Sequence, residues 1–452
     1  MKTFSLQRDI TVLKECDVAV IGGGPAGIGA AVSAARQNLR VLVVEKRGFL
    51  GGNITASYVE NCNYFIRNTP FESEGLYREI EEECYRQYGN DNLRSYNKYA
   101  FSSEYLKLYL DQLFQKEGIE VLFHSFVNEV VVDEGNISAI VVQTKQGPQA
   151  VVAKQYIDAT GDGDVAFASG VGFDQGRDTD HLCQPGTVSL RLSGADVPAL
   201  LDEGDGLAEI GRQFKIAYRS GETGLACKRQ DLPFGRLTGG GVVSYVNYSC
   251  AYGLDPTDVE DLSRGEVECR SYVWDIYDYL KRTHPALKDI EIASIAPEIG
   301  FRDSRRIHGH YRLTIEDMEA NRHFDDVVAI FPRFYDMLAP DAFMDGDGSV
   351  EGAGYKGHIY ETVKDERTFS VPYRSLIPQG VNNLLVAGRC ISCDHVAQSG
   401  IRAISLCMMT GQGAGVGAAL AVEGAVEPAQ VDIAELQRRL RALGLTIPTK
   451  EA

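Results

Sequence analysis

The chain has 452 residues, of which 44% are hydrophobic and 24% are charged, as in a folded globular protein with a large buried core. Its net charge of −18 argues against nucleic acid or an anionic membrane as a partner. The ten cysteines have no regular spacing, and neither a secretory leader nor a run of about 18 apolar residues is apparent. We therefore expect a cytoplasmic protein with two structural domains, reduced thiols and no membrane partner.

Residues 17–46 contain the strongest motif of the chain. An apolar strand leads into a glycine-rich turn, a helix of small residues follows, and a second apolar strand ends at an acid. These parts are Val18–Ile21, Gly22-x-Gly24-x-x-Gly27, the helix from Pro25, Val41–Val44 and Glu45. This order is typical of the βαβ unit that binds a dinucleotide, and the terminal acid can accept hydrogen bonds from both ribose hydroxyls.

The small residues of this unit suit a phosphate group. Gly22 permits the tight turn, and Gly24 lets the backbone approach a pyrophosphate. Gly27 lets the helix press closely against the sheet. The helix start at Pro25 and Ala26 directs free N–H groups and a positive dipole at the phosphate.

Two helices and a β-meander are expected next. Residues 72–89 read as a charged amphipathic helix that forms a surface or lid element, and residues 103–117 read as a second helix. Short strands separated by turns follow at 119–123, 127–132, 137–143, 151–152 and 155–159. The last of these strands runs into Ala159-Thr160-Gly161.

The middle of the chain has a mixed pattern, and the last part returns to the pattern of the first. Strands are expected near 186–193 and 241–250, a helix near 258–282 and a βα stretch over 290–320. No second strand–glycine–helix unit is apparent in this stretch. Further along, an apolar strand ends at Gly388-Arg389, a helix runs from Ile401 to Ala421, and a short helix spans 433–445.

Three distant segments favour FAD over NAD as the dinucleotide. They are the βαβ unit, the strand ending at Ala159-Thr160-Gly161 and the strand ending at Gly388-Arg389. FAD is long enough to be wrapped by all three. We expect the backbone of Val127 to reach the adenine and the 388–401 loop to meet the flavin. A helix N-terminus at Gly400–Ile401 would direct its positive dipole at the flavin edge that becomes negative on reduction.

Further stretches of the chain match a known family. Besides the segments quoted above, they are Ile299–Ile307 with its Arg302-Asp303-Ser304, Phe369–Pro378 and Cys407–Gly415. In these stretches the chain resembles the glutathione-reductase-type FAD-dependent oxidoreductases, and more narrowly the bacterial subgroup known simply as FAD-dependent oxidoreductases. The resemblance implies an α/β fold in which a Rossmann-type FAD-binding domain, with a parallel sheet and a β-meander, is interrupted by a mixed α+β substrate domain.

The same resemblance implies domain limits and a set of binding residues. The FAD-binding domain would be discontinuous, at 1–65, 100–175 and 371–425. A helical lid segment would occupy 66–99, the substrate domain 176–370, and a C-terminal helix and tail 426–452. The residues expected to bind FAD are Gly22, Gly24, Pro25, Ala26, Gly27, Glu45, Lys46, Gly51, Gly52, Val127, Ala159, Thr160, Gly161, Gly388, Arg389, Gly400 and Ile401.

Three residues are candidates for handling the substrate. A substrate that loses hydride usually also loses a proton, and His395 lies in the loop expected to meet the flavin. His358 could face the ring from the other domain. Arg302 could clamp a substrate carboxylate, whereas Arg305 and Arg306 are better explained as buried ion pairs at the domain interface.

Cysteine chemistry and metals are minor alternatives. Cys390-x-x-Cys393 could form a redox disulfide near the flavin, but disulfide reductases of this superfamily place their pair near the first Rossmann helix. No metal site is expected, because no second Cys or His pair has ligand spacing.

We therefore predict an FAD-dependent oxidoreductase that works as a dehydrogenase, oxidase or reductase. It would transfer hydride between a small organic substrate and flavin N5, with an unknown electron acceptor or donor and with a homo-oligomer left open. A flavin-dependent monooxygenase and a non-enzymatic flavin-binding protein are the alternatives. The single Trp excludes the halogenase motif Trp-x-Trp-x-Ile-Pro.

Overall fold

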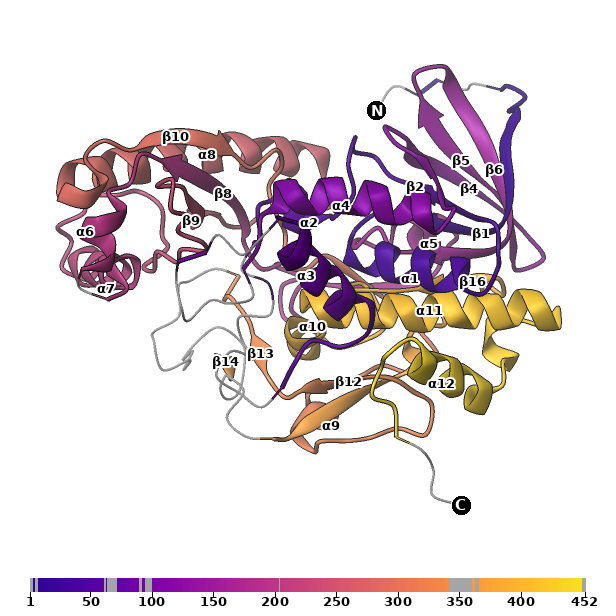
Figure 1. Ribbon diagram of the computed structural model, residues 1–452. Coiled ribbons are helices and arrows are strands. Elements are labelled where there is room, and N and C mark those ends of the chain that lie inside the picture. The colour runs from indigo at the N-terminus through magenta and orange to yellow at the C-terminus, as the bar shows by residue number, and fades with distance from the viewer. Residues whose placement is uncertain are drawn as a thin grey trace.

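The computed structural model describes residues 3–4, 7–60, 62, 71–88, 92–93, 100–202, 204–340, 360–361 and 366–448. Within these residues the chain forms two bodies around separate hydrophobic cores. Figure 1 shows a large body that contains both the early and the late parts of the chain, and a smaller body that projects to one side. The predicted fold class is confirmed, because a parallel-rich α/β unit carries a mixed α+β unit inserted between its segments.

A seven-stranded sheet forms the centre of the large body. Its order is β3-β2-β1-β6-β5-β4, and β16 pairs with the last residues of β6. The strands are β1 (Val12–Ile21), β2 (Val41–Val44), β3 (Glu120–Leu122), β4 (Phe126–Asp133), β5 (Asn136–Thr144), β6 (Gly147–Asp158) and β16 (Leu384–Val386). Parallel pairing joins β3, β2, β1, β6 and β16, whereas β4, β5 and β6 form the antiparallel meander.

The register of the parallel strands brings their carboxyl ends together. Ile21 of β1 lies beside Val44 of β2 and Asp158 of β6, and Asp158 lies beside Val386 of β16. Open α/β sheets bind their ligands at this kind of edge. The three predicted binding segments, although far apart in the sequence, therefore leave the sheet at neighbouring points.

Two helices of small residues pack closely on this sheet and on each other. They are α1 (Pro25–Ala35) and α11 (Ile404–Gly424), which lie side by side in Figure 1. A Cβ added to Gly29 would lie 2.2 Å from the carbonyl oxygen of Met408, and one added to Gly411 would lie 2.0 Å from that of Ala26. The glycines thus let the two backbones touch.

The helix expected at Ile401–Ala421 is confirmed as α11, three residues further along the chain, and a separate short helix precedes it. A short helix, α10 (His395–Ile401), is followed by α11. By length and composition α11 would be able to cross a membrane, but 89% of its most apolar window is buried inside the protein. Its apolar character is explained by its place in the core, where it meets α1 and the sheet.

Shorter helices cover the rest of the large body. They are α2 (Asn53–Ala56), α3 (Gly75–Tyr88), α4 (Ser103–Lys116), α5 (Asp164–Ala168) and α12 (Ile433–Ala442), with a 3-10 turn at Pro428–Gln430. The helices predicted for 72–89, 103–117 and 433–445 are confirmed with small shifts of their ends.

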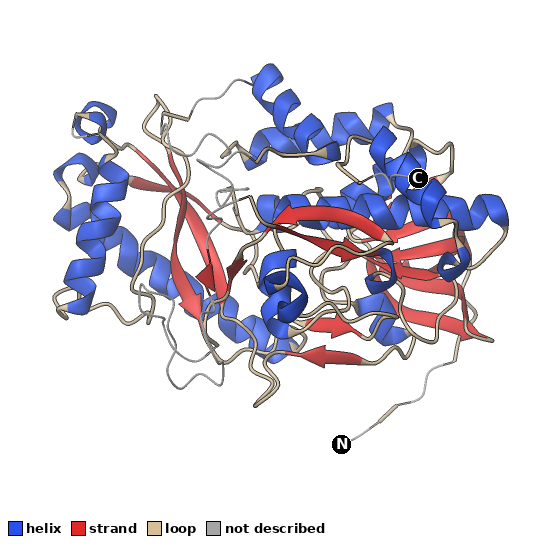
Figure 2. Cartoon of the chain, turned by 90° about the horizontal axis from the view of Figure 1, so that it is seen from below, coloured by secondary structure: helices blue, strands red, loops and turns tan. Residues whose placement is uncertain are grey.

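The smaller body is built from the middle of the chain. A three-stranded antiparallel sheet, in the order β10-β8-β9, packs against helices that Figure 2 shows on the same side of the molecule. Its elements are β8 (Gly186–Ser193), α6 (Val197–Leu201), α7 (Gly206–Arg219), β9 (Val243–Ala251), α8 (Val259–Thr283), a 3-10 turn at Pro285–Leu287 and β10 (Glu291–Ile295). The strands and the long helix predicted for this stretch are confirmed.

Short elements flank the smaller body along the chain. They are β7 (Phe173–Gln175), β11 (Arg305–Ile307), α9 (Ile315–Glu319), β12 (Val327–Pro332), β13 (Tyr335–Asp336), β14 (Tyr360–Glu361), β15 (Thr368–Pro372) and a 3-10 turn at Tyr373–Ser375. Ile307, Met318 and Val328, which the sequence analysis assigned to the substrate domain, contribute to the core of the large body. The division at residues 176 and 370 stays a prediction.

Candidate functional site

Three glycines shape the turn between β1 and α1, but in different ways. Gly22 has φ +104°, and a Cβ there would lie 2.4 Å from the carbonyl oxygen of Ala159. A Cβ on Gly27 would lie 1.7 Å from the carbonyl oxygen of Gly22. A Cβ on Gly24 would meet only Gly52, at 3.6 Å. Gly22 and Gly27 are therefore required by the packing of the protein, whereas Gly24 borders open space at the start of α1.

A second glycine pair lies against this turn. The N–H of Gly51 donates to the carbonyl oxygen of Gly23 at 2.8 Å. Gly52 has φ +55°, and a Cβ there would lie 2.8 Å from the Cα of Gly24. The two glycine segments thus face each other without side chains, and the free N–H groups of the first turn of α1 lie beside them.

Glu45 is buried at the end of β2 and holds the turn in place. Its Oε2 accepts a hydrogen bond from the N–H of Gly23 at 2.7 Å, and its Oε1 accepts one from the N–H of Arg47 at 2.9 Å. Arg47 continues the network, because its guanidinium group pairs with both Glu45 and Glu298. A carboxylate has about four lone-pair positions, so Glu45 retains acceptors for a ribose.

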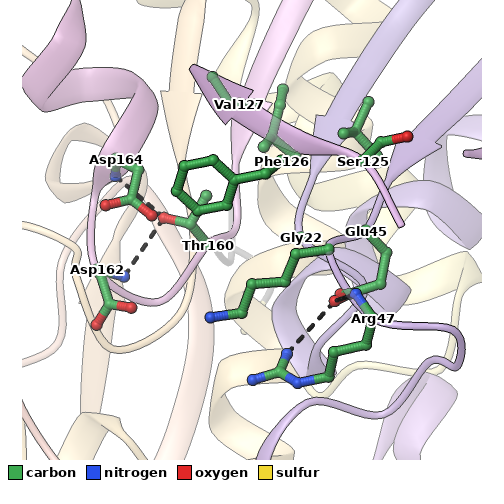
Figure 3. Close-up of a pocket in the computed structure, with 12 residues that line it drawn as sticks. Gly22, Glu45, Arg47, Ser125, Phe126, Val127, Thr160, Asp162 and Asp164 are labelled. Atoms are coloured by element: carbon green, nitrogen blue, oxygen red, sulfur yellow. Dashed lines mark hydrogen bonds and ion pairs between the residues drawn. The ribbon is translucent and has the colours of Figure 1, made fainter. Parts of the chain in front are cut away.

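A pocket opens beside this network. Figure 3 shows Phe126 and Val127 of β4 on one side of it and Thr160, Asp162 and Asp164 on another. The predicted residues that line it are Gly22, Glu45, Lys46, Val127 and Thr160. The sequence analysis missed Arg47, Ser125, Phe126, Asp162 and Asp164, which also line it. The acids directly after Gly161 were a visible signal, whereas nothing in the sequence singled out Phe126.

The loop after β6 is held by Asp158. This fully buried carboxylate accepts hydrogen bonds from the N–H and the hydroxyl of Thr160 and from the N–H of Ala166. Burial raises its pKa. Thr160 in turn accepts hydrogen bonds from the N–H groups of Asp162 and Asp164 (Figure 3). The predicted binding residue Thr160 is therefore fixed by the fold.

The pKa values of two acids of this loop are shifted in opposite directions. Burial alone would raise the pKa of Asp162, but the Arg389 guanidinium beside it and a hydrogen bond from Ser304 lower it. Burial and the nearby Asp162 and Asp158 raise the pKa of Asp164 to about 6, although Arg305 lies 2.9 Å away. Asp162 is thus an anion at neutral pH, and Asp164 is the acid of this pair that takes a proton first.

Arg389, expected to bind the cofactor, is engaged inside the protein. Its Nε donates to the carbonyl oxygen of Gly161 at 2.7 Å, its Nη1 donates to that of Phe301 at 2.7 Å, and its Nη2 pairs with Asp162 at 2.6 Å. This guanidinium group joins the loop after β16 to the loop after β6. Gly388 beside it packs on α1, because a Cβ there would lie 2.9 Å from the Cβ of Ala26.

His395 forms a buried pair with Asp303. Its Nε2 lies 2.5 Å from Oδ2 of Asp303, and the two residues are 4% and 0% exposed. The other carboxylate oxygen accepts a hydrogen bond from the N–H of Gln184 at 2.8 Å. His395 is the first residue of α10, whose N-terminus is capped by the side chain of Asp394. The fold thus fixes the imidazole from two directions.

Arg302, Arg305 and Arg306 make different contacts. Arg305 pairs with Asp164 and lies over the ring of Phe167. Arg306 is fully buried and donates to backbone carbonyl oxygens of Cys393 and Gly176. Both are therefore held inside the protein: Arg305 forms the expected ion pair, whereas Arg306 bonds to backbone carbonyl oxygens.

Arg302 contacts the smaller body. Within the described part of the chain no carboxylate lies within ion-pair distance of it, and its Nη1 donates to the carbonyl oxygen of Pro185 at 3.2 Å and to Thr187 at 3.4 Å. Burial lowers its pKa, and the positive charges of Arg229 and Arg402 lower it further.

Some expectations about the far end of the site are wrong or lie outside the described residues. The helix start expected at Gly400–Ile401 is wrong, because these residues end α10 and α11 begins at Ile404. The capping acid before His395 makes the earlier start favourable. A Cβ on Gly400 would meet Met318 and the backbone of Phe334. His358 lies outside the residues that the structure describes.

Cysteines and metals take no part in the site as described. Cys390 and Cys393 are free, buried thiols, and burial raises the pKa of both, which disfavours the reactive thiolate. In the described ranges no group of three His, Cys, Asp or Glu side chains is arranged to hold a metal ion.

The residues at the sheet edge fit FAD. Gly24 and Gly52 leave a cradle that a side chain would fill, and α1 points its N-terminus at this cradle. The pocket next to it offers a buried acid, Glu45, and an exposed aromatic side chain, Phe126. The cradle and the N-terminus of α1 match the phosphates of the cofactor, Glu45 matches its ribose, and Phe126 matches its adenine.

Comparison with known proteins agrees with this fit. Residues 17–440 match the family model described as FAD dependent oxidoreductase. Digeranylgeranylglycerophospholipid reductase 2 of Methanothermobacter thermautotrophicus is 29% identical over 195 residues, which cover 40% of this chain and 48% of that protein. Thiamine thiazole synthase of Methanococcus aeolicus is 29% identical over 155 residues, which cover 32% of this chain and 55% of that protein. This chain thus spans about half the length of the curated relatives it matches.

A solved structure is also similar in outline. A geranylgeranyl bacteriochlorophyll reductase-like protein from Thermoplasma acidophilum aligns over 95% of this chain and 83% of that chain, with 14% identity and a TM-score of 0.44.

Proposed function

This chain belongs to the FAD-dependent oxidoreductase family, and we propose that it transfers hydride between a small organic substrate and its FAD. Bound FAD supplies the group that accepts or gives the hydride. Gly24, Gly52 and the start of α1 would hold its phosphates, and Glu45 its ribose. The remaining steps fall to side chains of the protein, which must hold the substrate and move its proton.

The proposal depends on one observation: four consecutive residues join the loops after β6 and β16 to His395. The carbonyl oxygen of Phe301 accepts a hydrogen bond from Arg389 of the loop after β16, and the hydroxyl of Ser304 donates to Asp162 of the loop after β6. Between them, Asp303 pairs with His395. The segment 301–304 therefore places a buried histidine at a fixed position relative to the cofactor loops.

His395 is suited to take the proton that a substrate loses together with its hydride. The Asp303 carboxylate stabilises the positive charge that the imidazole gains, and it fixes the orientation of the ring. Burial of both side chains keeps the proton away from bulk water. Such a positioned base commonly accelerates proton transfer by roughly 100-fold or more.

We also propose that FAD lies extended as in glutathione-reductase-type flavoproteins and that the protein is cytoplasmic, as the sequence suggested. The meeting of β1, β6 and β16 at one sheet edge supports the path found in glutathione-reductase-type flavoproteins. The ten cysteines are all free and buried, which supports a reducing compartment such as the cytoplasm.

Anaerobic reduction of the holoenzyme tests the proposal. Pools of small metabolites and NAD(P)H are added to the purified protein with its FAD, and the visible flavin absorbance is followed. We expect at least one pool to bleach the flavin and His395→Gln to slow the bleaching without loss of FAD. His308→Gln is the matched control, because His308 forms a comparable but exposed pair with Asp174.

Two results would contradict the proposal. Dithionite could bleach the flavin while no metabolite or nicotinamide does, which would remove the oxidoreductase activity. Alternatively, substrate could stimulate NAD(P)H consumption and gain an oxygen atom, which would support the monooxygenase instead.

A further inference from the structure

The outer face of α8 exposes large apolar side chains. The inner face of this helix is buried in the smaller body through Cys269, Val273, Ile276 and Leu280. On the outer face, Val267 is 66% exposed and Trp274 is 62% exposed. The ring of Tyr277 lies beside that of Trp274, with the two centroids 5.4 Å apart. Figure 1 shows α8 along the outer side of the smaller body. Exposed apolar groups that gather on one face commonly mark a contact with another macromolecule.

The exposed apolar residues belong to a stripe with a regular spacing. Four residues of α8 follow one another at intervals of seven: Glu260, Val267, Trp274 and Lys281. Because an α-helix has about 3.6 residues per turn, this spacing keeps all four on one side of the helix over about 32 Å. The stripe is apolar in the middle and charged at both ends. Helices that pair along their length use this kind of repeat.

The two ends of this stripe carry opposite charges. The first turn of α8 contains Glu260 and Asp261, and the last turn contains Lys281 and Arg282. The side chain of Arg282 is 66% exposed. Charges of these signs also suit the helix dipole, but the dipole does not account for the exposed apolar residues between them. A partner that carries the same groups in the reverse order would bring each charged end against its opposite.

A second copy of α8 that runs antiparallel has this reverse order. A two-fold axis between Arg270 and Ser271 sets Val267 of one protomer opposite Trp274 of its partner, and the acidic first turn beside the basic last turn. Arg270 already pairs with Glu266 at 2.6 Å, so it brings no unpaired charge to the axis. The stripe is therefore complementary to itself, as the interface of a two-fold dimer must be.

We propose that the outer face of α8 binds a second copy of this chain as an antiparallel helix pair. Val267 and Trp274 form its apolar centre, and the charged ends of the two helices fix their direction. A single pair of helices offers less contact area than the roughly 800 Å² per partner of a standard interface, so we expect a dissociation constant in the micromolar range. The dimer contact is independent of the proposed chemistry of the cofactor.

Cross-linking of introduced cysteines in the holoenzyme tests the direction of the pair. Ser271→Cys places one thiol per protomer next to the two-fold axis, where a short bifunctional maleimide can join them. Ser263→Cys is the matched control, because Ser263 is also exposed on this helix but its two copies would lie about 22 Å apart along the helix axis. The ten native cysteines are buried and give a low background. We expect a cross-linked dimer with Ser271→Cys alone.

Sedimentation equilibrium of the holoenzyme, from micromolar to millimolar concentration, measures the strength of the contact. Val267→Glu and Trp274→Glu should each raise the dissociation constant about tenfold or more, because each places a charge in the apolar centre. Val131→Glu, on the exposed strand β4, is the control and should dimerise as the wild type does. Glu260→Arg and Arg282→Glu should each weaken the dimer, and the double variant should regain affinity because opposite charges meet again. The FAD content and the unfolding transition show whether each variant is intact.

Four results would overturn the assignment. They are a wild type that stays monomeric at every concentration, a dimer that neither Val267→Glu nor Trp274→Glu weakens, equal cross-linking of Ser271→Cys and Ser263→Cys, and a double charge variant that regains no affinity. The second result would place the dimer contact on another surface, and the third would exclude the antiparallel arrangement. Because association is measured without reduction of the flavin, a failure to find a reducing substrate contradicts the proposed function and leaves this assignment intact.

Discussion

The glycine cradle around Gly24 and the buried pair of Asp303 with His395 are built by opposite means. The cradle uses backbone N–H groups, a helix N-terminus and missing side chains, and its turn and helix come from one short stretch of sequence. The pair uses two side chains that lie 92 residues apart in the sequence, and Nε2 of His395 lies 2.5 Å from Oδ2 of Asp303. A backbone site is readable from local sequence, whereas a side-chain site exists only after folding. The predictions below test this contrast.

The largest effect is expected at the cradle, where backbone geometry allows no substitute. Gly27→Ala would place a Cβ 1.7 Å from a carbonyl oxygen, so α1 must move away from β1. We expect a loss of roughly 3 kcal/mol in the free energy of unfolding, measured by urea denaturation. Gly24→Ala is the matched control, since it should keep the stability of the apoprotein while it weakens FAD retention. Equal stability of both variants would contradict the distinction.

The buried pair of Asp303 with His395 can be tested with the cofactor still bound. Asp303→Asn keeps the shape but removes the charge that stabilises protonated His395. We expect flavin reduction by substrate to slow by roughly 100-fold while the FAD content is retained. Rapid-mixing absorbance over a range of pH measures this. Asp174→Asn, at the exposed pair with His308, should not change the rate. An unchanged rate in Asp303→Asn would remove the pair from the mechanism.

A smaller effect is expected at Phe126, an aromatic side chain in the wall of the pocket beside the cradle. Phe126 is 54% exposed at the pocket wall, where it can stack on a flat ring. Phe126→Ala should weaken FAD binding by about 1 kcal/mol, or about fivefold, in a fluorescence titration of the apoprotein. Val131→Ala, further along the same exposed strand, is the control and should bind FAD as the wild type does.

The smallest effect concerns the pH dependence of stability. Asp164 has a pKa of about 6 in the folded protein, above the ordinary aspartate value of 3.8, so folding favours the protonated form. Its contribution to stability therefore falls as the pH rises between these two values. The side chain is 37% exposed, and solvent screening limits this loss to less than about 1 kcal/mol. The stability difference between Asp164→Asn and the wild type should grow by that amount over the same pH range.

Local sequence patterns correctly predicted the elements that depend on the hydrophobic period and on turn residues. The βαβ unit, the β-meander and the helices at 103–117 and 258–282 follow from hydrophobic period and turn residues, and they lie where we expected them. The helix expected at Ile401–Ala421 lies three residues further along as α11, but the short helix α10 before it, which the capping Asp394 begins, was not expected. Capping competes with hydrophobic pattern at this point, and only the folded context decides between them.

The contacts of four arginines show more clearly what the sequence alone does not predict. Arg302, Arg305, Arg306 and Arg389 look alike in the sequence as charged residues near glycine-rich or apolar segments. In the structure, Arg389 and Arg305 pair with acids of the loop after β6, and Arg306 bonds to backbone carbonyl oxygens. Arg302 resembles Arg306, because it donates to a backbone carbonyl oxygen, that of Pro185, and no ion pair joins it to a carboxylate among the described residues.

The sequence by itself determined the fold class, the cofactor and the glycine turn that faces it, because these depend on backbone conformation within a few tens of residues. The tertiary structure alone decided three contacts: the pairing of Asp303 with His395, the pairing of Asp162 with Arg389, and the hydrogen bond from Arg302 to the carbonyl oxygen of Pro185. These features depend on which side chains meet across long stretches of chain. Electrostatic and hydrogen-bond partners act over a few ångströms in space, and the sequence does not display that distance.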